Sequence, residues 1–271
     1  MRIITSFMAL ALTLAIHAVA GEIICEANGF AGHLQGIAAD ATGIYWSFYD
    51  TVVKTDYTGK TLTTVKNPRH AGDLCAVDGK IYVSTVYYDS KMAAEEGGTG
   101  WLYIYNADLV FEKKVALPKT PRPDGITFLN GKFYIAGDDF GKESHPLNTI
   151  SVYDANLNFE RNITIDIGKE TKYGAQTLNA MDGRILAGFY CSFPNAYSLE
   201  LPELKTADSF PLSVNVGMAV VPSEISAGRK IILVARLTGQ KGDCGGRVLV
   251  YEMQEGKPVL ADFTPAMPGK P

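Results

Sequence analysis

The sequence predicts an all-β protein folded as a single β-propeller of four-stranded antiparallel blades. Two observations carry this prediction. A unit of four short strands recurs about every 46 residues, and most units hold an Asp-Gly or Asn-Gly turn at the same place. Four-stranded antiparallel units repeated at this period are typical of propellers. Five blades are expected, with six as the alternative.

The turn between the first and second strands is the clearest anchor of the repeat. It reads ATGIYWSF, VDGKIYVS, LNGKFYIA, MDGRILAG and, more weakly, SAGRKIILV, with its glycines at Gly43, Gly79, Gly131, Gly183 and Gly228. These glycines are 36, 52, 52 and 45 residues apart. Asp-Gly and Asn-Gly favour two-residue hairpin turns because both positions need a positive φ. Each of these stretches therefore predicts a hairpin.

The remaining strands recur in the same order. Third strands are predicted in TVVKTDYTGK, WLYIYNADLV, NTISVYDANL, NAYSLELPEL and GRVLVYEMQE, and fourth strands in LTTVK, EKKVALP, RNITIDI, ADSFPL and PVLADF. The leading segment EIICEANGF resembles an outer strand placed ahead of the first unit. We expect it to complete the last blade and so to close the ring, which removes an open sheet edge.

Residues 1–20 have the pattern of a secretory signal peptide. Arg2 precedes an apolar run that ends at Ile16, and Ala18-Val19-Ala20 gives a small-x-small cleavage site. No later stretch reaches the roughly 20 apolar residues of a membrane helix. Removal of the signal leaves 251 residues, 21–271, as one propeller domain. A secreted or periplasmic protein without a transmembrane anchor after cleavage is expected, and a retained anchor is the alternative.

The composition narrows the classes of partner and of activity. The net charge is −4, and the basic residues are scattered, so nucleic acid is not an expected partner. The sequence has no GxSxG elbow, no phosphate-binding GxxxxGK[ST], no GxGxxG before a helix and no HExxH. We expect a monomer whose partner is a small molecule or a glycan.

The four cysteines lack CxxC spacing, which argues against a zinc ribbon. In an exported chain they can pair in three ways. A Cys191–Cys244 disulfide is preferred because both residues fall in loops between the second and third strands of consecutive blades. Cys25–Cys244 is its main rival, and unpaired thiols are the further alternative. Cys75 lies on an inner strand and is expected to be buried as a small apolar residue.

Polar residues gather in the loops of one face of the predicted propeller, which we call the upper face. These loops join each outer strand to the next inner strand, and each second strand to the third. They hold all three histidines of residues 21–271, which are His33, His70 and His145. Loops on one face of a rigid scaffold are where binding and catalytic residues are most often found.

His33, His70, Asp73 and Asp124 are the predicted catalytic residues. Each lies at the start of an inner strand, where a side chain is expected to face the central channel. Carboxylates and imidazoles in one funnel suit calcium or another divalent cation, for which His33, His70 and Asp138 are the predicted ligands. Such a metal would activate a water molecule. Without a metal, a His base and a Tyr acid suit a lyase.

Each of these residues also has a structural interpretation. An Asp at the start of an inner strand can accept backbone N–H groups and tie blades together. A lone loop His can be solvated or can cap the chain.

A second group of upper-face residues is expected to contact the substrate: Tyr87, Tyr88, Arg122, Tyr173 and Arg236. Exposed aromatic rings would make a platform for sugars, whereas buried rings would pack between blades. An arginine at a strand end would face an anionic group of the substrate or pair with a structural Asp.

The stretch PRPDGITFLNGKFYIAGDD resembles the gluconolactonase, regucalcin and NHL-type propellers. That resemblance implies a propeller, often of six blades, and in the gluconolactonase branch a calcium-dependent lactonase with Glu, Asn and Asp ligands. This chain has no Asn-Asp pair ahead of Pro123-Asp124-Gly125 and no matching early Glu. The fold is therefore implied and the lactonase activity is not. A metal-assisted hydrolase or lyase acting on a carbohydrate or lactone is the leading hypothesis, and a non-catalytic propeller that binds a glycan, small ligand or protein is the alternative.

Overall fold

The computed structural model describes residues 21–30, 32–68, 70–87, 91, 94, 100–137, 144–214, 216–236 and 245–266. The predicted signal peptide lies outside these residues, as do Tyr88, Asp138 and Cys244. In the described part of the chain, no helix has the length and apolar character needed to cross a membrane.

Two four-stranded sheets follow one another from the start of the propeller. In each, the strands pair in chain order and antiparallel. The first unit consists of β2 (Leu34–Asp40), β3 (Gly43–Phe48), β4 (Thr51–Thr55) and β5 (Thr61–Lys66). The second consists of β6 (His70–Val77), β7 (Lys80–Val86), β8 (Gly100–Asn106) and β9 (Phe111–Ala116).

The next two units share one long strand and so form a seven-stranded sheet. The strands are β10 (Pro123–Leu129), β11 (Lys132–Gly137), β12 (His145–Asp154), β13 (Phe159–Met181), β14 (Arg184–Tyr190), β15 (Ala196–Glu200) and β16 (Lys205–Phe210). The first part of β13 pairs with β12 as an outer strand, and its last ten residues pair with β14 as an inner strand. The stretch KETKYGAQ, predicted as a loop, therefore belongs to the strand, because β13 pairs with β12 on one side of it and with β14 on the other.

The fifth unit closes the ring. It contains β17 (Met218–Val220), β18 (Ile231–Ala235) and β19 (Arg247–Gln254), and two short strands share the outer edge of β19. β1 (Glu22–Ile24) pairs with the first half of β19, and β20 (Lys257–Leu260) pairs with its second half. The prediction that the leading segment completes the last blade is confirmed. The outer strand is composite, made from both ends of the chain.

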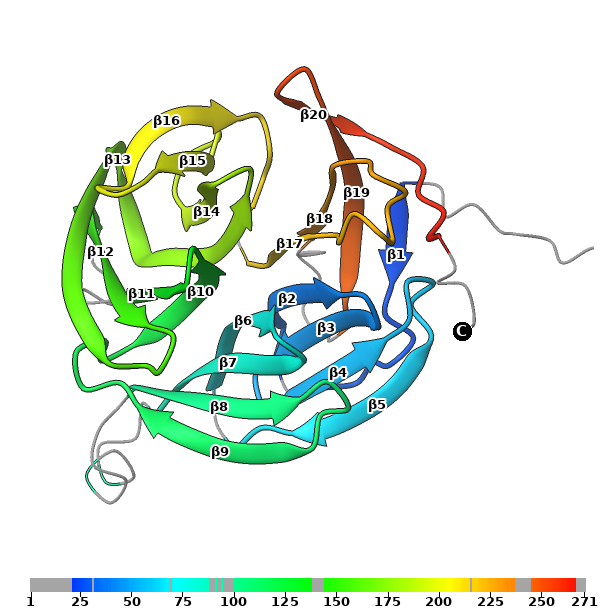
Figure 1. The fold of residues 1–271 in the computed structure, drawn as a ribbon, viewed down its shortest axis with the longest axis horizontal. Helices are drawn as coiled ribbons and strands as arrows, with labels where there is room; N and C mark the ends of the chain where they lie inside the picture. Colours follow the sequence, from blue (N-terminus) through cyan, green and yellow to red (C-terminus); the bar gives the residue numbers. More distant parts are fainter. Residues whose placement is uncertain are drawn as a thin grey trace, which may run out of the picture.

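These sheets are arranged around a centre, with β2, β6, β10, β17 and the end of β13 innermost (Figure 1). The predicted all-β propeller architecture is confirmed. The described strands make five four-stranded units, and the blade count of the whole chain stays a prediction.

Three of the five predicted hairpin turns have the predicted backbone, whereas Gly43 has a φ of 158° and the Gly228 turn is replaced by the longer segment between Val220 and Ile231. Asp78-Gly79, Asn130-Gly131 and Asp182-Gly183 have positive φ at both positions, between 49° and 78°. This is the conformation that favours Asn or Asp followed by Gly in a two-residue hairpin. The turns set the register of each first and second strand, and with it the height of every side chain along the channel.

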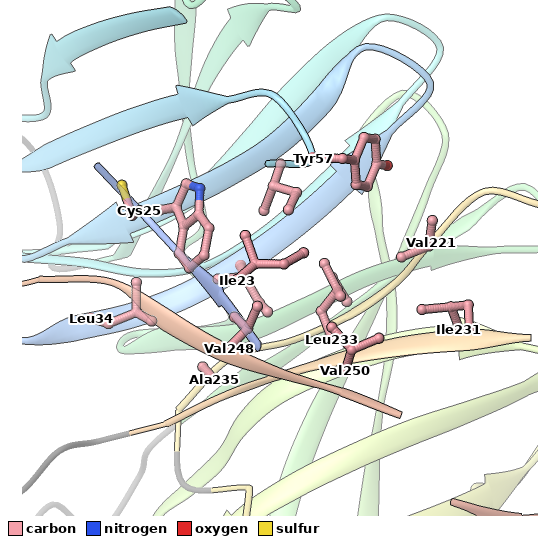
Figure 2. Close-up of a cluster of buried hydrophobic side chains, with 14 of the residues drawn as sticks. Ile23, Cys25, Leu34, Tyr57, Val221, Ile231, Leu233, Ala235, Val248 and Val250 are labelled. Atoms are coloured by element: carbon pink, nitrogen blue, oxygen red, sulfur yellow. The ribbon is translucent and has the colours of Figure 1, made fainter. Parts of the chain in front are cut away.

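Apolar side chains from neighbouring units form the core. Where the last unit meets the first, Ile23 and Cys25 pack among residues of β2, β18 and β19 (Figure 2). Ile23 is 1% exposed, and the Trp46 side chain is fully buried in the same cluster. The closing strand therefore contributes to the core as well as to backbone pairing.

Candidate ligand site at the upper mouth of the channel

The inner strands begin at one end of the channel, the upper mouth, and four of them are irregular there. Their pairing with the second strand shifts register between Leu34 and Gly36, between Ala71 and Leu74, between Pro123 and Ile126, and between Lys172 and Ala175. A β-bulge re-aims a side chain and is common beside functional sites. The bulged residues include Gln35, Asp73, Asp124 and Tyr173, so polar groups recur at one height around the channel.

Asp73 is fully buried and spans the channel. Its Oδ2 accepts the backbone N–H of Ile126 on β10 at 3.4 Å and of Leu178 on β13 at 3.1 Å. A Cβ placed on Gly36 of β2 would lie 2.6 Å from Asp73 Oδ1. Asp73 therefore meets three other units at once. This geometry favours the structural interpretation, in which the carboxyl ties blades together.

Burial also controls the ionisation of Asp73. Desolvation raises the pKa of this carboxyl well above its usual value, and the nearby charge of Asp124 acts in the same direction. Backbone and hydroxyl donors, led by the Leu178 N–H, oppose the shift. Desolvation is the larger effect, because burial disfavours the charged form of the carboxyl.

Asp124 is half-buried beside Asp73. Ser84 joins the two residues, because its hydroxyl bonds to the backbone carbonyls of Asp73, at 2.8 Å, and Asp124. Asp124 also acts on Tyr190 at the end of β14. Burial first, then the charge of Asp124, and then Tyr173 raise the pKa of Tyr190 to about 12. At neutral pH the site thus holds a protonated phenol beside the Asp124 side chain.

Tyr173 completes this group, which we call the tyrosine–carboxylate cluster (Asp124, Tyr173 and Tyr190). The rings of Tyr173 and Tyr190 meet edge to face, with centroids 5.8 Å apart. Tyr173 has a φ of 60°, a strained value for a large side chain. The bulge in β13 therefore holds an aromatic ring at the mouth in a conformation that a regular strand would not adopt.

His33 and His70 form a second upper-face group with Tyr49. Burial and the nearby His33 lower the pKa of His70 to about 4. The His70 ring meets the Tyr49 ring edge-on, with centroids 4.9 Å apart. His33 is exposed, and its Nδ1 lies 2.7 Å from the Leu34 carbonyl oxygen, to which it donates. The structure thus brings the two imidazoles together and, separately, the two carboxylates.

Titration of His70 tests this environment. We expect its imidazole to remain neutral down to about pH 4, because burial disfavours the charged form. Two-dimensional NMR of imidazole nitrogens, assigned with a His70→Gln variant, would measure the pKa. A His70 resonance that titrates at the usual pH of about 6.5 would show that the ring is solvated.

The other predicted contact residues are dispersed. Tyr87 is 2% exposed, with its hydroxyl bonded to that of Tyr103 and its ring near Trp101, so its geometry favours packing within the core. Arg122 is half-buried and Arg236 is exposed. Tyr88 falls outside the described residues.

The predicted metal site and disulfide each include one residue outside the described chain. The described residues contain no group of three metal-ligating side chains, and Asp138, the third predicted ligand, is not among them. Cys25, Cys75 and Cys191 form no disulfide with one another, and Cys244 is not described. Both predictions remain predictions. The expected burial of Cys75 is confirmed, since it is 8% exposed.

Tyr190 and Gln35 are the site residues that the sequence analysis missed. Tyr190 ends a second strand, in RILAGFY, and the position one residue after the first unit's second strand holds Tyr49. An aromatic residue at this strand end in two units was the available signal. Gln35 offered none, because the bulge that re-aims it leaves no trace in the pattern.

Comparisons with known proteins support the fold and no more. No family model matches the chain, and no curated protein sequence matches it. The crystal structure of Myxococcus xanthus glutaminyl cyclase is similar at a TM-score of 0.58 and 14% identity, covering 87% of this chain and 95% of that one. A protein of unknown function from Bacteroides caccae is similar at a TM-score of 0.52 and 11% identity, covering 89% and 93%. The resemblance to gluconolactonase-type propellers therefore stays a prediction.

Proposed function

We propose that this chain is an exported β-propeller that binds a carbohydrate or another small, hydroxyl-rich ligand at the upper mouth of its channel. The observation that carries the proposal is the set of bulges at one height, which bring polar side chains to the same level around the channel. At that level, the tyrosine–carboxylate cluster combines aromatic faces with a hydrogen-bond acceptor. Tyrosine rings offer apolar faces to a sugar, and a carboxylate accepts hydrogen bonds from its hydroxyl groups.

Export rests on the predicted signal peptide. Amino-terminal sequencing of the protein purified from its natural host would test it, with Gly21 expected as the first residue. A protein that starts at Met1 would remove the secreted or periplasmic assignment.

Catalysis is the second candidate, favoured by the neutral imidazole of His70. A base with a pKa of about 4 is unprotonated at neutral pH, and the protonated Tyr190 is a proton donor. Hydrolysis of a lactone or elimination from a uronate would use these groups, alone or with a divalent cation held by His33, His70 and Asp138. Glutaminyl cyclase from M. xanthus is an enzyme on a similar fold, although 14% identity transfers no activity.

The binding proposal is tested by Asp124→Asn. We expect the substitution to weaken binding of an oligosaccharide, found on an array of neutral and uronate-containing glycans, by tenfold or more, because an amide supplies one acceptor where the carboxylate supplies two oxygens. Calorimetry would measure the affinity. Asp208→Asn is the matched control, since that carboxylate is 69% exposed on the outer strand β16. Equal affinities in the two variants, with unchanged melting temperatures, would show that the oligosaccharide does not bind at the upper mouth.

A second set of measurements separates binding from catalysis. Turnover of a lactone or uronate substrate by the wild type, lost in His70→Gln, would establish the enzyme. Glycan binding without turnover of any lactone or uronate substrate would support a binding protein that is not an enzyme. A stoichiometric divalent cation that is lost in His70→Ala would support the metal-assisted version, and a metal-free protein would exclude it.

A further inference from the structure

A cavity opens at the opposite end of the channel, where the inner strands end, and we call this end the lower mouth. Its volume is about 460 Å³, within the range of small-molecule sites. All five inner strands line it: β2 through Ala38, β6 through Ala76, β10 through Thr127, β13 through Ala180 and β17 through Val220. Four of these strands are the ends of their sheets, and the last ten residues of β13 pair only with β14, so each turns toward the channel an edge that has no strand partner among the described residues.

Small side chains create this space. Ala38 and Ala39 on β2, Cys75 and Ala76 on β6, and Ala180 on β13 all line the cavity. Protein interiors are normally close-packed, so a cavity bounded by small residues on three strands differs from an ordinary filled channel. Burial raises the pKa of the Cys75 thiol well above its usual value, so this wall carries no charge.

Thr127 and Asn179 are polar residues of the cavity wall. Thr127 is 4% exposed, and its hydroxyl has both a donor and an acceptor to offer a ligand. By contrast, the Asn179 side chain is fully used, because it accepts the N–H of Val220 and donates to the carbonyls of Leu178 and Met218. Of these two residues, Thr127 is therefore the one that would bond to a ligand.

The rim is built by a segment that breaks the repeat. In the fifth unit, residues 221–230 replace the short hairpin turn and contribute Arg229 and Lys230 to the cavity wall. The segment is ordered by backbone bonds from Ile225 to Pro222 and from Gly228 to Ser223, and the Ile225 side chain is 2% exposed. The two cations are therefore held at the lower mouth by a specific structure.

The two cations differ in how firmly they are held. Arg229 bonds to Glu252 at 2.7 Å and to the Asp262 carbonyl, which orients its guanidinium. Lys230 pairs with Asp182 at 2.6 Å, and both of these side chains are more than half exposed. An exposed ion pair contributes little to stability, at most about 1 kcal/mol. Lys230 is thus able to exchange Asp182 for a ligand.

We propose that the lower mouth binds a small organic carboxylate whose apolar body enters the channel. Leu74, Phe128 and Met181 line the cavity and would contact that body. Lys230 would pair with the carboxylate, and Thr127 would bond a polar atom deeper in. Arg229 is already paired with Glu252, so Lys230, whose ion pair with Asp182 is exposed, is the lining cation that would attract an anion. This proposal goes beyond the upper-mouth site and does not depend on it.

The experiment uses the full mature chain and three probes of the same shape: 4-phenylbutyrate, 4-phenylbutanol and 4-phenylbutylamine. Saturation-transfer NMR and calorimetry should show that 4-phenylbutyrate binds most tightly of the three. Lys230→Met should weaken its binding about tenfold. Lys257→Met, at an exposed position at the start of β20, should leave its binding unchanged. Asp182→Asn should strengthen it severalfold, because Lys230 would then be released.

Filling the cavity supplies an independent test. Ala180→Phe should abolish binding, and Ala76→Leu serves if the first variant does not fold. Asp124→Asn, at the other mouth, should have no effect, which separates this proposal from the proposed function. No detectable binding of 4-phenylbutyrate, preference for the amine, or equal affinity in Lys230→Met and Lys257→Met would each overturn the proposal.

Discussion

Replacing Asp73 by alanine is expected to lower the free energy of unfolding by about 3 kcal/mol. The substitution removes the acceptor of two buried backbone N–H groups, those of Ile126 and Leu178. Each unsatisfied buried donor costs about 1–3 kcal/mol. Because these donors lie on strands of two other units, the loss affects the contacts that hold the inner strands together. Urea unfolding followed by circular dichroism would measure it.

Asparagine at the same position separates the hydrogen bonds from the charge. Asp73→Asn keeps an oxygen for both N–H groups and should retain most of the stability at acidic pH. In the wild type, the folded-state pKa of Asp73 is raised above the ordinary value of 3.8, so the native state binds more protons than the unfolded chain. The stability that Asp73 contributes to the folded state is therefore complete below about pH 4. It is lost as the pH rises toward the folded-state pKa of this carboxyl.

The expected result is that Asp73→Asn gains stability relative to the wild type as pH increases. Between pH 4.5 and 8 the gain should reach at least about 1.4 kcal/mol, the equivalent of one pKa unit. Asp208→Ala, on an exposed outer strand, is the control for the alanine variant and should change stability by less than about 0.5 kcal/mol. Parallel pH profiles for Asp73→Asn and the wild type would mean that Asp73 is ionised in the folded protein.

The fold could be predicted because its signals are local and repeated. Asp78-Gly79, Asn130-Gly131 and Asp182-Gly183 each specify a hairpin by backbone conformation alone, and alternating strands on both sides give the period. The continuous strand β13 could not be predicted. Lys169 to Tyr173 has the polar composition of a loop, and only the pairing of β13 with β12 and with β14 makes it part of one strand.

The site was less predictable because its geometry depends on contacts between distant segments. The start of β6 correctly marked Asp73 as a channel residue, yet its role depends on N–H groups that lie 53 and 105 residues away. Sequence position likewise placed His33 and His70 on adjacent units, and the structure shows that they interact. The lower-mouth cavity arises from single alanines on separate strands, each ordinary by itself. Its one local signal was the irregular turn SAGRK.

Ring closure gives the second large effect, expected at Ile23 of β1. Ile23→Ala should lower the free energy of unfolding by about 3 kcal/mol, because a fully buried side chain is truncated where the last unit meets the first. The segment is bound on both sides. Glu22–Ile24 pairs with β19, and the Glu26 N–H donates to the Gly59 carbonyl of the first unit at 2.9 Å. A weakened β1 therefore loosens two units together.

Ile24 supplies a matched control on the same strand. Its side chain is 51% exposed, so Ile24→Ala should cost less than about 1 kcal/mol with the same loss of volume and the same backbone pairing. Deletion of residues 21–26 should be more severe than Ile23→Ala, because it also uncovers half of the β19 edge and leaves a template for pairing between chains. Light scattering would then show association that the point variants lack. Losses below about 1 kcal/mol in both Ile23→Ala and Ile24→Ala would mean that β1 closes the ring through its backbone alone, since the two variants differ only in which face of the strand they truncate.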